Sequence, residues 1–290
     1  MRKLAILAIV ATVLAGCVKN NPDPAWLEVN EWTLASNATN VPNEGELTHN
    51  FTDAWVFIDN KLIGVFEVPF KIPVLVSGTS EIKLYPTIKD NGISATKKIY
   101  PFVDPYIIDA ELVENQTLTI DPVTNYKDDI TILPWDFEDA STGIVETPLS
   151  ETQSYLNNDQ NLLGPYNGGG CLTVEFDDNN ALWQATNETL LENLPKQGAE
   201  LYLELDYHNT LGLITGVVAI DNGSANSNVN VQVNGQDPNE VEWKKIYIDI
   251  STIVSGYPGA SGYYLSFDAL LPDSLSSARI NIDNMKVVHF

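Results

Sequence analysis

Apolar and polar residues alternate with a period of two through most of the chain after residue 25. The clearest case is the stretch EIKLYPTIK, where Ile82, Leu84, Pro86 and Ile88 share one face and charged or polar residues share the other. This alternation predicts a β-strand with one buried face and one face in water. Because Pro86 lacks an amide hydrogen, we expect this strand to lie at a sheet edge or to carry a bulge.

Two short polar turns separate strands in the first half of the chain. Asp59-Asn60-Lys61 lies between the apolar runs AWVFI and LIGVFEV, and Asn91-Gly92 follows EIKLYPTIK. Asn and Gly tolerate the positive φ angles of tight hairpin turns that match strand twist. The sequence therefore predicts a β-hairpin at each turn.

The second half contains further strand-like runs at the spacing of a β-sandwich. They are CLTVEF, LYLELDYHN, GVVAI, NVNVQVNG, KKIYIDIS, GYYLSFDALL and ARINIDNMKVV. In LYLELDYHN, the leucines are predicted to face the core, and Glu204, Asp206 and His208 to face water. We also expect one short helix near residues 187–194, where Asn187 is a weak cap.

The last strand breaks its own alternation. In RINIDNMKVV the apolar positions move from Ile280 and Ile282 to Met285 and Val287, a step of three instead of two. Such a step predicts a β-bulge near Asp283-Asn284, and a bulge can re-aim a carboxylate.

Length and composition agree with two packed domains. The chain has 290 residues, of which 44% are hydrophobic, enough to build folded cores. We predict an all-β protein, in which a small immunoglobulin-like sandwich over 26–121 and a linker over 122–133 precede a larger β-jelly-roll sandwich over 134–290.

The start of the chain predicts export. Arg2 and Lys3 precede the apolar run 4–14, which is shorter than the ~20 residues that span a bilayer. The following Leu14-Ala15-Gly16-Cys17 resembles the lipobox of bacterial lipoproteins. The resemblance implies a signal peptide over 1–16, cleavage before Cys17, and acylation of Cys17, as with palmitate. Residues 17–25 would then form a lipidated tether.

The mature chain is strongly acidic. Removing Arg2 and Lys3 takes the formal net charge from −24 to −26. Such a surface argues against nucleic-acid binding and against peripheral binding to anionic lipid. It suits a basic partner, divalent cations, or simply solubility.

The first domain resembles the PEGA-type surface domain, a small immunoglobulin-like sandwich. The matching residues are Val56-Phe57-Ile58-Asp59-Asn60, Gly64, Pro69, Gly78 and the strand from Glu81, although Asn60 stands where Gly is usual. The region also resembles uncharacterised lipoproteins of Bacteroidota bacteria. That resemblance implies an outer-membrane lipoprotein, on the periplasmic or the cell-surface face, whose first domain is a scaffold or contact module.

The second domain resembles the jelly roll of carbohydrate-binding modules and galactose-binding-like domains. Such domains commonly open with a Phe-Glu sequence and close with Ile-Asp-Asn before two hydrophobic residues, which match Phe137-Glu138 and the strand from Ile282. The resemblance implies a structural Ca²⁺ held by Asp136, Glu138 and Asp283, and carboxylates are suitable ligands for that ion. The alternative is a plain bulge with Asp283 in water or bonded to a backbone amide.

The strand NVNVQVNG is a candidate ligand-binding element. Val229, Val231 and Val233 are predicted to point inward, which leaves four amides on the opposite face: Asn228, Asn230, Gln232 and Asn234. Amides donate and accept hydrogen bonds, which suits hydroxyl-rich ligands. Trp183, Tyr257, Tyr263 and Tyr264 are candidate stacking partners. The alternative is a solvated sheet face with the aromatic residues in the core.

Catalysis has little support in the sequence. The chain contains no HExxH, Cys-x-x-Cys, P-loop, GxGxxG or GxSxG motif. His49, His208 and His289 lie in polar or terminal segments, and Cys171 is expected to be a buried apolar residue. Adjacent carboxylates such as Asp177-Asp178 point to opposite faces of a strand, so they do not form the facing pair that a glycosidase needs.

These observations lead to one main functional hypothesis and two alternatives. The first is a non-catalytic outer-membrane lipoprotein that binds a protein partner in a cell-envelope assembly. The alternative is a surface lipoprotein that binds carbohydrate, and a hydrolase is a remote third. Asp273-Ser274-Leu275 resembles the O-glycosylation acceptor of Bacteroidota envelope proteins, which implies a glycan on Ser274.

Overall fold

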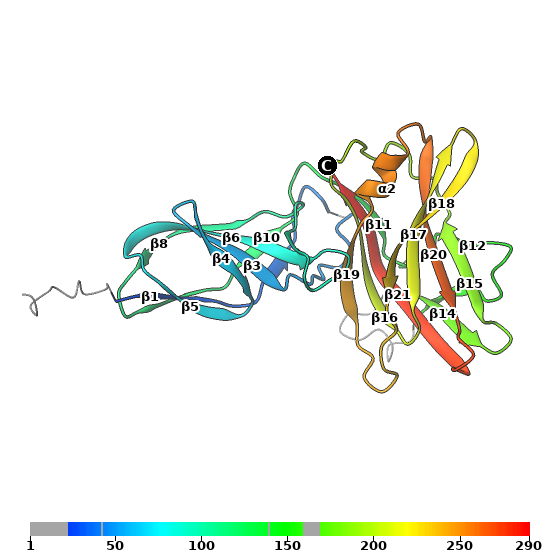
Figure 1. Cartoon of the computed structure of the whole chain (residues 1–290), viewed down its shortest axis with the longest axis horizontal. Helices are drawn as coiled ribbons and strands as arrows, with labels where there is room; N and C mark the ends of the chain where they lie inside the picture. Colours follow the sequence, from blue (N-terminus) through cyan, green and yellow to red (C-terminus); the bar gives the residue numbers. More distant parts are fainter. Residues whose placement is uncertain (1–22, 42, 139, 159–168) are drawn as a thin grey trace, which may run out of the picture.

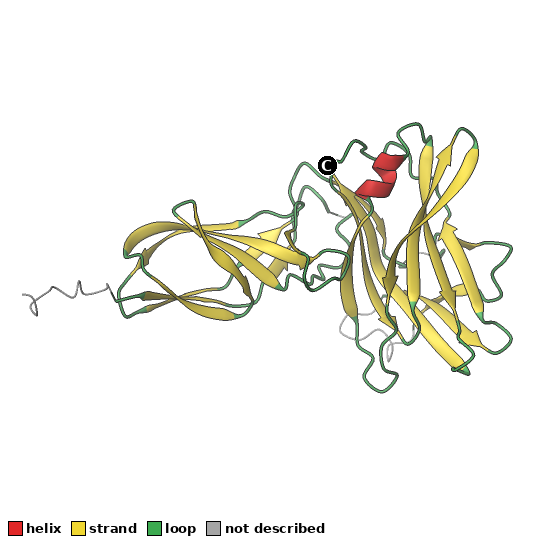
Figure 2. Ribbon diagram, viewed as in Figure 1, coloured by secondary structure: helices red, strands yellow, loops and turns green. Residues whose placement is uncertain are grey.

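A computed structural model describes residues 23–41, 43–138, 140–158 and 169–290. The signal peptide and Cys17 lie outside these residues. Within them the chain forms 21 strands and one short helix, α2 (Ser251–Gly256), arranged as two β domains in a row (Figures 1 and 2). The all-β prediction is confirmed.

Ten short strands build the first domain. They are β1 (Ala25–Val29), β2 (Thr33–Ala35), β3 (Asp53–Ile58), β4 (Lys61–Glu67), β5 (Phe70–Val74), β6 (Gly78–Lys89), β7 (Lys97–Ile99), β8 (Tyr106–Leu112), β9 (Thr117–Ile120) and β10 (Val123–Asn125). One sheet has the order β4-β3-β6-β7, with β8 also paired to β6, and a second has the order β5-β1-β9. β10 pairs in parallel with β2.

The strand β6 follows the predicted alternation but not the predicted position. Ile82, Leu84, Pro86 and Ile88 are buried while Glu81, Lys83 and Tyr85 are half-buried, as expected. Thr87, predicted on the wet face, is buried instead. The expectation of an edge strand or a bulge at Pro86 is wrong, because β6 lies between β3 and the two strands β7 and β8. Pro86 pairs with Ala54 and lies where β6 changes partner from β8 to β7, so the missing donor interrupts neither ladder.

Both predicted hairpins are present. Asp59 and Asn60 have φ angles of 49° and 62° between β3 and β4, and Asn91 and Gly92 have φ angles of 54° and 71° after β6. Two consecutive positive φ angles are typical of the turn type whose twist matches that of the flanking strands.

Eleven strands build the second domain. They are β11 (Thr131–Trp135), β12 (Ile144–Glu146), β13 (Ser154–Asn157), β14 (Cys171–Asp177), β15 (Leu182–Asn187), β16 (Leu201–Asn209), β17 (Leu213–Asp221), β18 (Ser224–Val233), β19 (Lys244–Asp249), β20 (Gly262–Leu270) and β21 (Ser277–His289). The range 122–133, expected as the linker, contains β10 and the beginning of β11.

The second domain is a sandwich of two antiparallel sheets. One has the order β13-β14-β21-β16-β19, with β11 also on β21, and we call it the docked sheet because the first domain packs against it. The other has the order β12-β15-β20-β17-β18, and we call it the distal sheet because it lies on the side far from the first domain (Figure 1). Apolar side chains from both sheets form the core between them.

Two local predictions for this domain have opposite outcomes. The bulge near Asp283-Asn284 is confirmed: the pairing of β16 with β21 shifts register between Glu204 and Asp206, and Asn284 has a φ of 46°. The helix predicted near 187–194 is wrong, because Asn187 ends β15 and residues 188–194 form a loop. The Asn187 side chain accepts a hydrogen bond from the amide of Leu265 on β20 instead of capping a helix.

No helix among the described residues is long and apolar enough to cross a membrane.

Candidate functional site

The first domain covers the outer face of the docked sheet. This face carries polar and aromatic side chains that are all at least 96% buried, namely Tyr202, Glu204, Asp206, Lys245, Tyr247, Asn284 and Lys286. The prediction that Glu204 and Asp206 face water is therefore wrong. The alternation of β16 is as predicted, but its polar face meets another domain instead of solvent. His208, further along the strand, is half-buried.

Opposite charges balance within this interface. Lys245 Nζ lies 3.1 Å from Glu204 Oε2 and 3.6 Å from Asp206 Oδ1. Tyr100 and Tyr126 of the first domain donate hydrogen bonds to the Glu204 carboxylate. Burial favours a raised pKa for Glu204, but Lys245, Lys286 and the hydrogen bonds outweigh it, so that its pKa lies below the ordinary value. Pairing offsets the desolvation cost of burying these charges. It also favours the one orientation of the two domains in which every charge has its partner.

The first domain also covers the edge of the docked sheet at β19. The amide of Asn91 donates to the carbonyl of Tyr247 at 3.0 Å, and the Asn91 side-chain oxygen accepts from the amide of Asp249 at 2.8 Å. Asn50 Nδ2 donates to the carbonyl of Lys245 at 3.0 Å. These hydrogen bonds occupy backbone N–H and C=O groups of β19. On an uncovered edge strand, such groups are free to pair with another protein chain.

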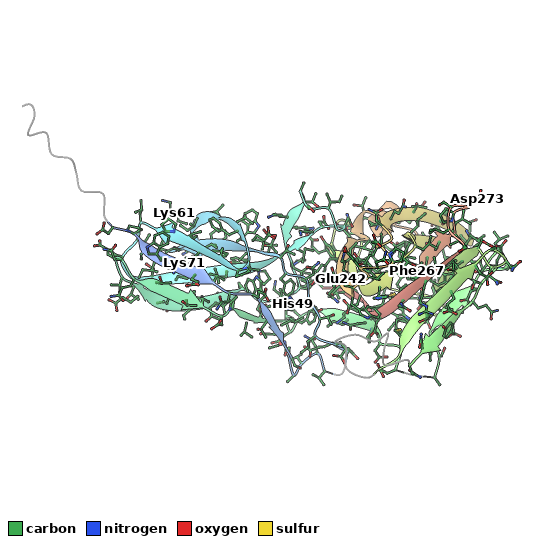
Figure 3. All side chains as sticks on the ribbon, turned by 90° about the horizontal axis from the view of Figure 1, so that it is seen from below. His49, Lys61, Lys71, Glu242, Phe267 and Asp273 are labelled. Atoms are coloured by element: carbon green, nitrogen blue, oxygen red, sulfur yellow. The ribbon has the colours of Figure 1, made fainter. Side chains whose placement is uncertain are left out.

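The distal sheet is consequently the sheet of the second domain whose outer face the first domain leaves uncovered. In Figure 1 it forms the end of the second domain opposite the first domain. Figure 3 shows the same order from another side, with Lys61 and Lys71 in the first domain, Glu242 near the junction and Asp273 at the far end. A ligand on this face would meet the side of the second domain that points away from the first domain.

A shallow groove of about 430 Å³ runs over the outer face of the distal sheet. Its polar centre is the pair Gln184 and Asp268, in which Gln184 Nε2 donates to Asp268 Oδ1 at 2.7 Å. Leu182, Ile214, Val229 and Leu270 flank the pair, with Ser227 at one side. Val229 and Leu270 are 72% and 63% exposed, so the groove has apolar walls open to solvent.

Strand register explains why these residues meet. Gln184 on β15 lies directly opposite Asp268 on β20, and Asp268 lies directly opposite Ile214 on β17. Side chains two residues away on either side share this face because the side-chain period of a strand is two. Sequence reasoning missed Gln184 and Asp268. The sequence does contain a signal for them. Both are polar residues that alternate with apolar ones, in ALWQATN and YYLSFDALL, as residues on the outer face of a strand do.

The amide strand β18 differs from its prediction. Thr215 pairs with Val231 but Gly216 pairs with Val229, so Asn230 is an extra residue in a bulge. Val231 and Val233 face the core as predicted, whereas Val229 points to solvent, and the inward prediction for Val229 is wrong. A single-face amide ladder therefore does not form.

The four amides take different roles. Asn228 Nδ2 donates to the carbonyl of Val217, and Asn230 Nδ2 to the carbonyl of Asp249. Gln232 and Asn234 lie further along, beside a cleft at the domain junction. Asn228 links two strands of the distal sheet, whereas Asn230 joins that sheet to β19 of the docked sheet. Gln232 and Asn234 remain candidates for a ligand.

The predicted aromatic partners lie mainly in the core. Trp183 is fully buried and stacks on Phe267, with ring centroids 6.1 Å apart, so its predicted contact with a ligand is wrong. Tyr263 is buried too. Tyr257 is half-buried and its hydroxyl donates to Asn228 Oδ1 at 3.1 Å. Tyr264 is half-buried on the outer face of the distal sheet.

The predicted calcium ligands lie near the closing strand. The amide of Glu138 donates to Asp136 Oδ1 at 3.2 Å. Asp283 is 6% exposed and accepts a hydrogen bond from the amide of Asn284 at 2.6 Å. Burial raises its pKa to about 7, and Asp206 and Glu138 add to the rise. Among the described residues, no group of three or more His, Cys, Asp or Glu side chains is placed to hold a metal ion. The Ca²⁺ site stays a prediction.

The groups considered for nucleophilic chemistry lie apart from the groove. Cys171 is buried, and burial raises the pKa of its thiol to about 11, which disfavours the reactive thiolate. Burial lowers the pKa of His208, whose ring lies 5.6 Å from that of Trp243. His49 stacks on Phe51 in the first domain. Ser274 is exposed in the loop between β20 and β21, and its glycosylation stays a prediction.

Comparison with known proteins yields structural similarity alone. No family model and no curated protein matches the chain. A CBM22 xylan-binding domain from Paenibacillus barcinonensis is 12% identical, with a TM-score of 0.38, and the match covers 55% of this chain and 99% of that one. A CBM28 module specific for non-crystalline cellulose is 15% identical, with a TM-score of 0.38 and coverage of 53% and 91%. The tailspike protein 4 of bacteriophage CBA120 is 17% identical, with a TM-score of 0.37 and coverage of 52% and 20%. The solved structures similar to part of the chain thus include carbohydrate-binding modules.

Proposed function

We propose that this protein is a non-catalytic glycan-binding lipoprotein of the outer membrane. Lipid on Cys17 anchors it, the first domain is a spacer, and the distal sheet presents the ligand-binding face. The observation that carries the proposal is the groove around Gln184 and Asp268 on the one face of the second-domain sandwich that the first domain leaves uncovered.

The chemistry of the groove suits a sugar chain. Gln184 and Asp268 make one hydrogen bond with each other. The amide oxygen of Gln184 and the second carboxylate oxygen of Asp268 remain available to accept hydrogen bonds from sugar hydroxyl groups. Leu182, Ile214 and Val229 offer aliphatic surface to the C–H faces of pyranose rings. A groove that combines a polar centre with apolar walls follows the general pattern of ligand sites.

The same lining argues for binding without turnover. Asp268 is the one carboxylate among the described residues that line the groove. Glycoside hydrolysis ordinarily uses two facing carboxyl groups, one as acid and one as base or nucleophile. This groove can therefore hold a glycan but lacks the pair that would cleave it.

Affinity electrophoresis and calorimetry test the proposal. Xylan and soluble cellulose derivatives are the first probes, followed by a glycan array. We expect the wild-type ectodomain to bind at least one glycan, and Gln184→Ala and Asp268→Ala to weaken binding by roughly tenfold or more, since each removes a hydrogen bond to the ligand. Gln116→Ala, at an exposed position in the first domain, is the matched control. The proposal fails if no glycan binds, or if both groove variants bind as tightly as the control.

A protein partner is the second candidate for this face. Val229, Leu270 and Val145 are exposed on alternate strands of the distal sheet, β18, β20 and β12. Exposed apolar side chains that gather on one face mark interaction sites. A pull-down from an outer-membrane extract, with Val229→Lys and Leu270→Lys as variants, separates the two candidates. Loss of a captured protein in these variants, with no glycan bound by the wild type, would favour the protein partner.

The membrane anchor has its own test. We expect cells grown with labelled palmitate to label the wild-type chain but not Cys17→Ser. Protease treatment of intact cells then separates a cell-surface from a periplasmic location. Absence of label from the wild-type chain would remove the anchor from the proposal without touching the glycan groove.

A further inference from the structure

A second hollow lies at the junction of the two domains. This cleft of about 400 Å³ lies between the Asn91-Gly92 turn of the first domain and the loop that joins β18 to β19 in the second. Figure 3 shows Glu242, one of its lining residues, near the junction. The volume is within the range of small-molecule sites, roughly 300–1,000 Å³.

The wall from the first domain is held in place by backbone and side-chain bonds. Asn91 binds both Tyr247 and Asp249 of β19, as described above. Tyr202 donates to Asp90 Oδ1 at 3.0 Å. A Cβ on Gly92 would lie 3.0 Å from Ile246 Cδ1, so the turn already touches the second domain.

The wall from the second domain is equally constrained. Gln236 Nε2 donates to the carbonyl of Glu242 at 2.9 Å, and Gln236 Oε1 accepts from the amide of Glu242 at 3.3 Å, which closes the loop on itself. The buried Asn209 side chain donates to the carbonyl of Asn234 at 3.2 Å. Both walls are therefore preorganised, which lowers the entropy that a ligand must overcome.

Several polar groups of the cleft have no hydrogen-bond partner among the described residues. Within the described part of the chain, the Tyr207 hydroxyl and the side-chain amides of Gln232 and Asn234 make no hydrogen bond, although all three residues line the cleft. Burial raises the pKa of Tyr207, so its hydroxyl remains a donor at neutral pH. A phenol and two amides can satisfy a ligand that both donates and accepts.

The charges of the cleft restrict that ligand. Asp237, Glu240 and Glu242 line it, and Lys244 is the one cation among its described lining residues. Lys244 Nζ lies 3.4 Å from Glu242 Oε1, so its charge is partly compensated. The remaining negative charge repels carboxylate and sulfate groups.

We propose that the cleft is a second ligand site, formed jointly by the two domains, that takes a short oligosaccharide without acidic groups. This inference deepens the proposed function and rests on it. The distal groove and the junction cleft share no lining residue, although β18 contributes to both. One chain can therefore engage two stretches of glycan, and the linked sites raise the overall avidity.

Nuclear magnetic resonance of the whole ectodomain tests the cleft separately from the groove. The distal groove is first inactivated with Gln184→Ala and Asp268→Ala together. Xylohexaose and cellohexaose are the uncharged probes, and a hexamer of galacturonic acid is the anionic probe. We expect an uncharged hexamer to shift the side-chain amide signals of Gln232 and Asn234, and the anionic hexamer to leave them unchanged.

Two variants then assign the contacts. Tyr207→Phe keeps the shape of the side chain and removes its hydroxyl, and Asn234→Ala removes one amide. Each is expected to weaken binding at the cleft by fivefold or more, whereas Tyr155→Phe, at an exposed position on β13, leaves it unchanged.

The outcomes distinguish the two proposals. If the wild type binds an uncharged hexamer but the groove-inactivated protein shows no amide shift, the cleft inference is overturned and the groove stands. If the anionic hexamer shifts the same amides equally, the restriction to uncharged glycans is overturned. If neither protein binds any glycan, both proposals fail.

Discussion

Tyr100 of the first domain donates its hydroxyl hydrogen bond to the carboxylate of Glu204 in the second domain, and both side chains are almost completely buried. Tyr126 donates to the same carboxylate from the first domain. A buried carboxylate whose donors come from another domain is satisfied when the two domains are docked and loses these partners when they separate. We infer that the two domains behave as one unit, with the distal sheet facing away from the first domain.

Lys245 is the residue whose loss should most disturb this unit. Lys245→Ala leaves Glu204 and Asp206 buried without their ammonium partner, and breaking a buried pair in this way costs about 3–5 kcal/mol. Urea unfolding followed by tryptophan fluorescence measures the change. Lys71→Ala is the control, because the Lys71–Glu28 pair is exposed and such pairs contribute about 1 kcal/mol or less. Equal effects of the two substitutions would show that the interface charges do not stabilise the fold.

The second prediction concerns the pH dependence of stability. Burial lowers the pKa of Lys286 to about 8, and the nearby Lys245 adds to this, while Glu204 and Asp206 oppose it. A lysine in the unfolded chain titrates near pH 10.4. Between about pH 8 and 10.4 the unfolded state therefore binds more protons, so the contribution of Lys286 makes the free energy of unfolding rise with pH in this window. Below pH 8 both states are protonated and the cost of burying the charge is constant.

The difference in the free energy of unfolding between the wild type and Lys286→Met isolates the contribution of Lys286. We expect the free energy of unfolding of the wild type, relative to the variant, to increase by about 2–3 kcal/mol between pH 8 and 10.4. Urea titrations at intervals of half a pH unit measure it. Tyrosine ionisation affects both proteins and cancels in the difference. Lys61→Met, at an exposed position, should give a flat difference, and an equally flat curve for Lys286→Met would contradict the prediction.

Local structure was largely predictable from the sequence because its causes are local. The alternation of β6 and β16, the turns at Asp59-Asn60 and Asn91-Gly92, and the bulge near Asp283 each follow from the spacing of residues within one segment. The environment of Glu204 was not predictable in this way. A strand with one apolar and one polar face looks the same whether its polar face meets water or a second domain.

The candidate site was harder to predict for the same reason. The bulge at Asn230 turns Val229 to solvent, yet the run NVNVQVNG contains no break in its alternation. The extra residue becomes visible only when β18 is paired with β17. Gln184 and Asp268 meet because two strands lie in register, a relationship between segments that are far apart in the sequence.

Asn284 provides the last prediction, because it combines a local and a long-range role. Its φ of 46° is easy for Gly, so a purely conformational role predicts that Asn284→Gly is harmless. Its side-chain Nδ2, however, carries two hydrogens and lies within hydrogen-bond distance of three acceptors: Thr48 Oγ1 at 2.7 Å, the carbonyl of Glu46 at 2.9 Å and Asp206 Oδ2 at 2.9 Å. Two of these acceptors belong to the first domain.

We therefore expect Asn284→Gly to destabilise the protein by about 1–3 kcal/mol, the cost of leaving buried polar groups without partners. Asn222→Gly is the matched control, since Asn222 has a φ of 50° in an exposed turn. That substitution keeps the backbone angle without breaking a contact between domains, so it should change stability little. Urea unfolding of the two variants measures the difference. Equal stabilities would mean that the backbone angle, and not the bridge between domains, accounts for asparagine at this bulge.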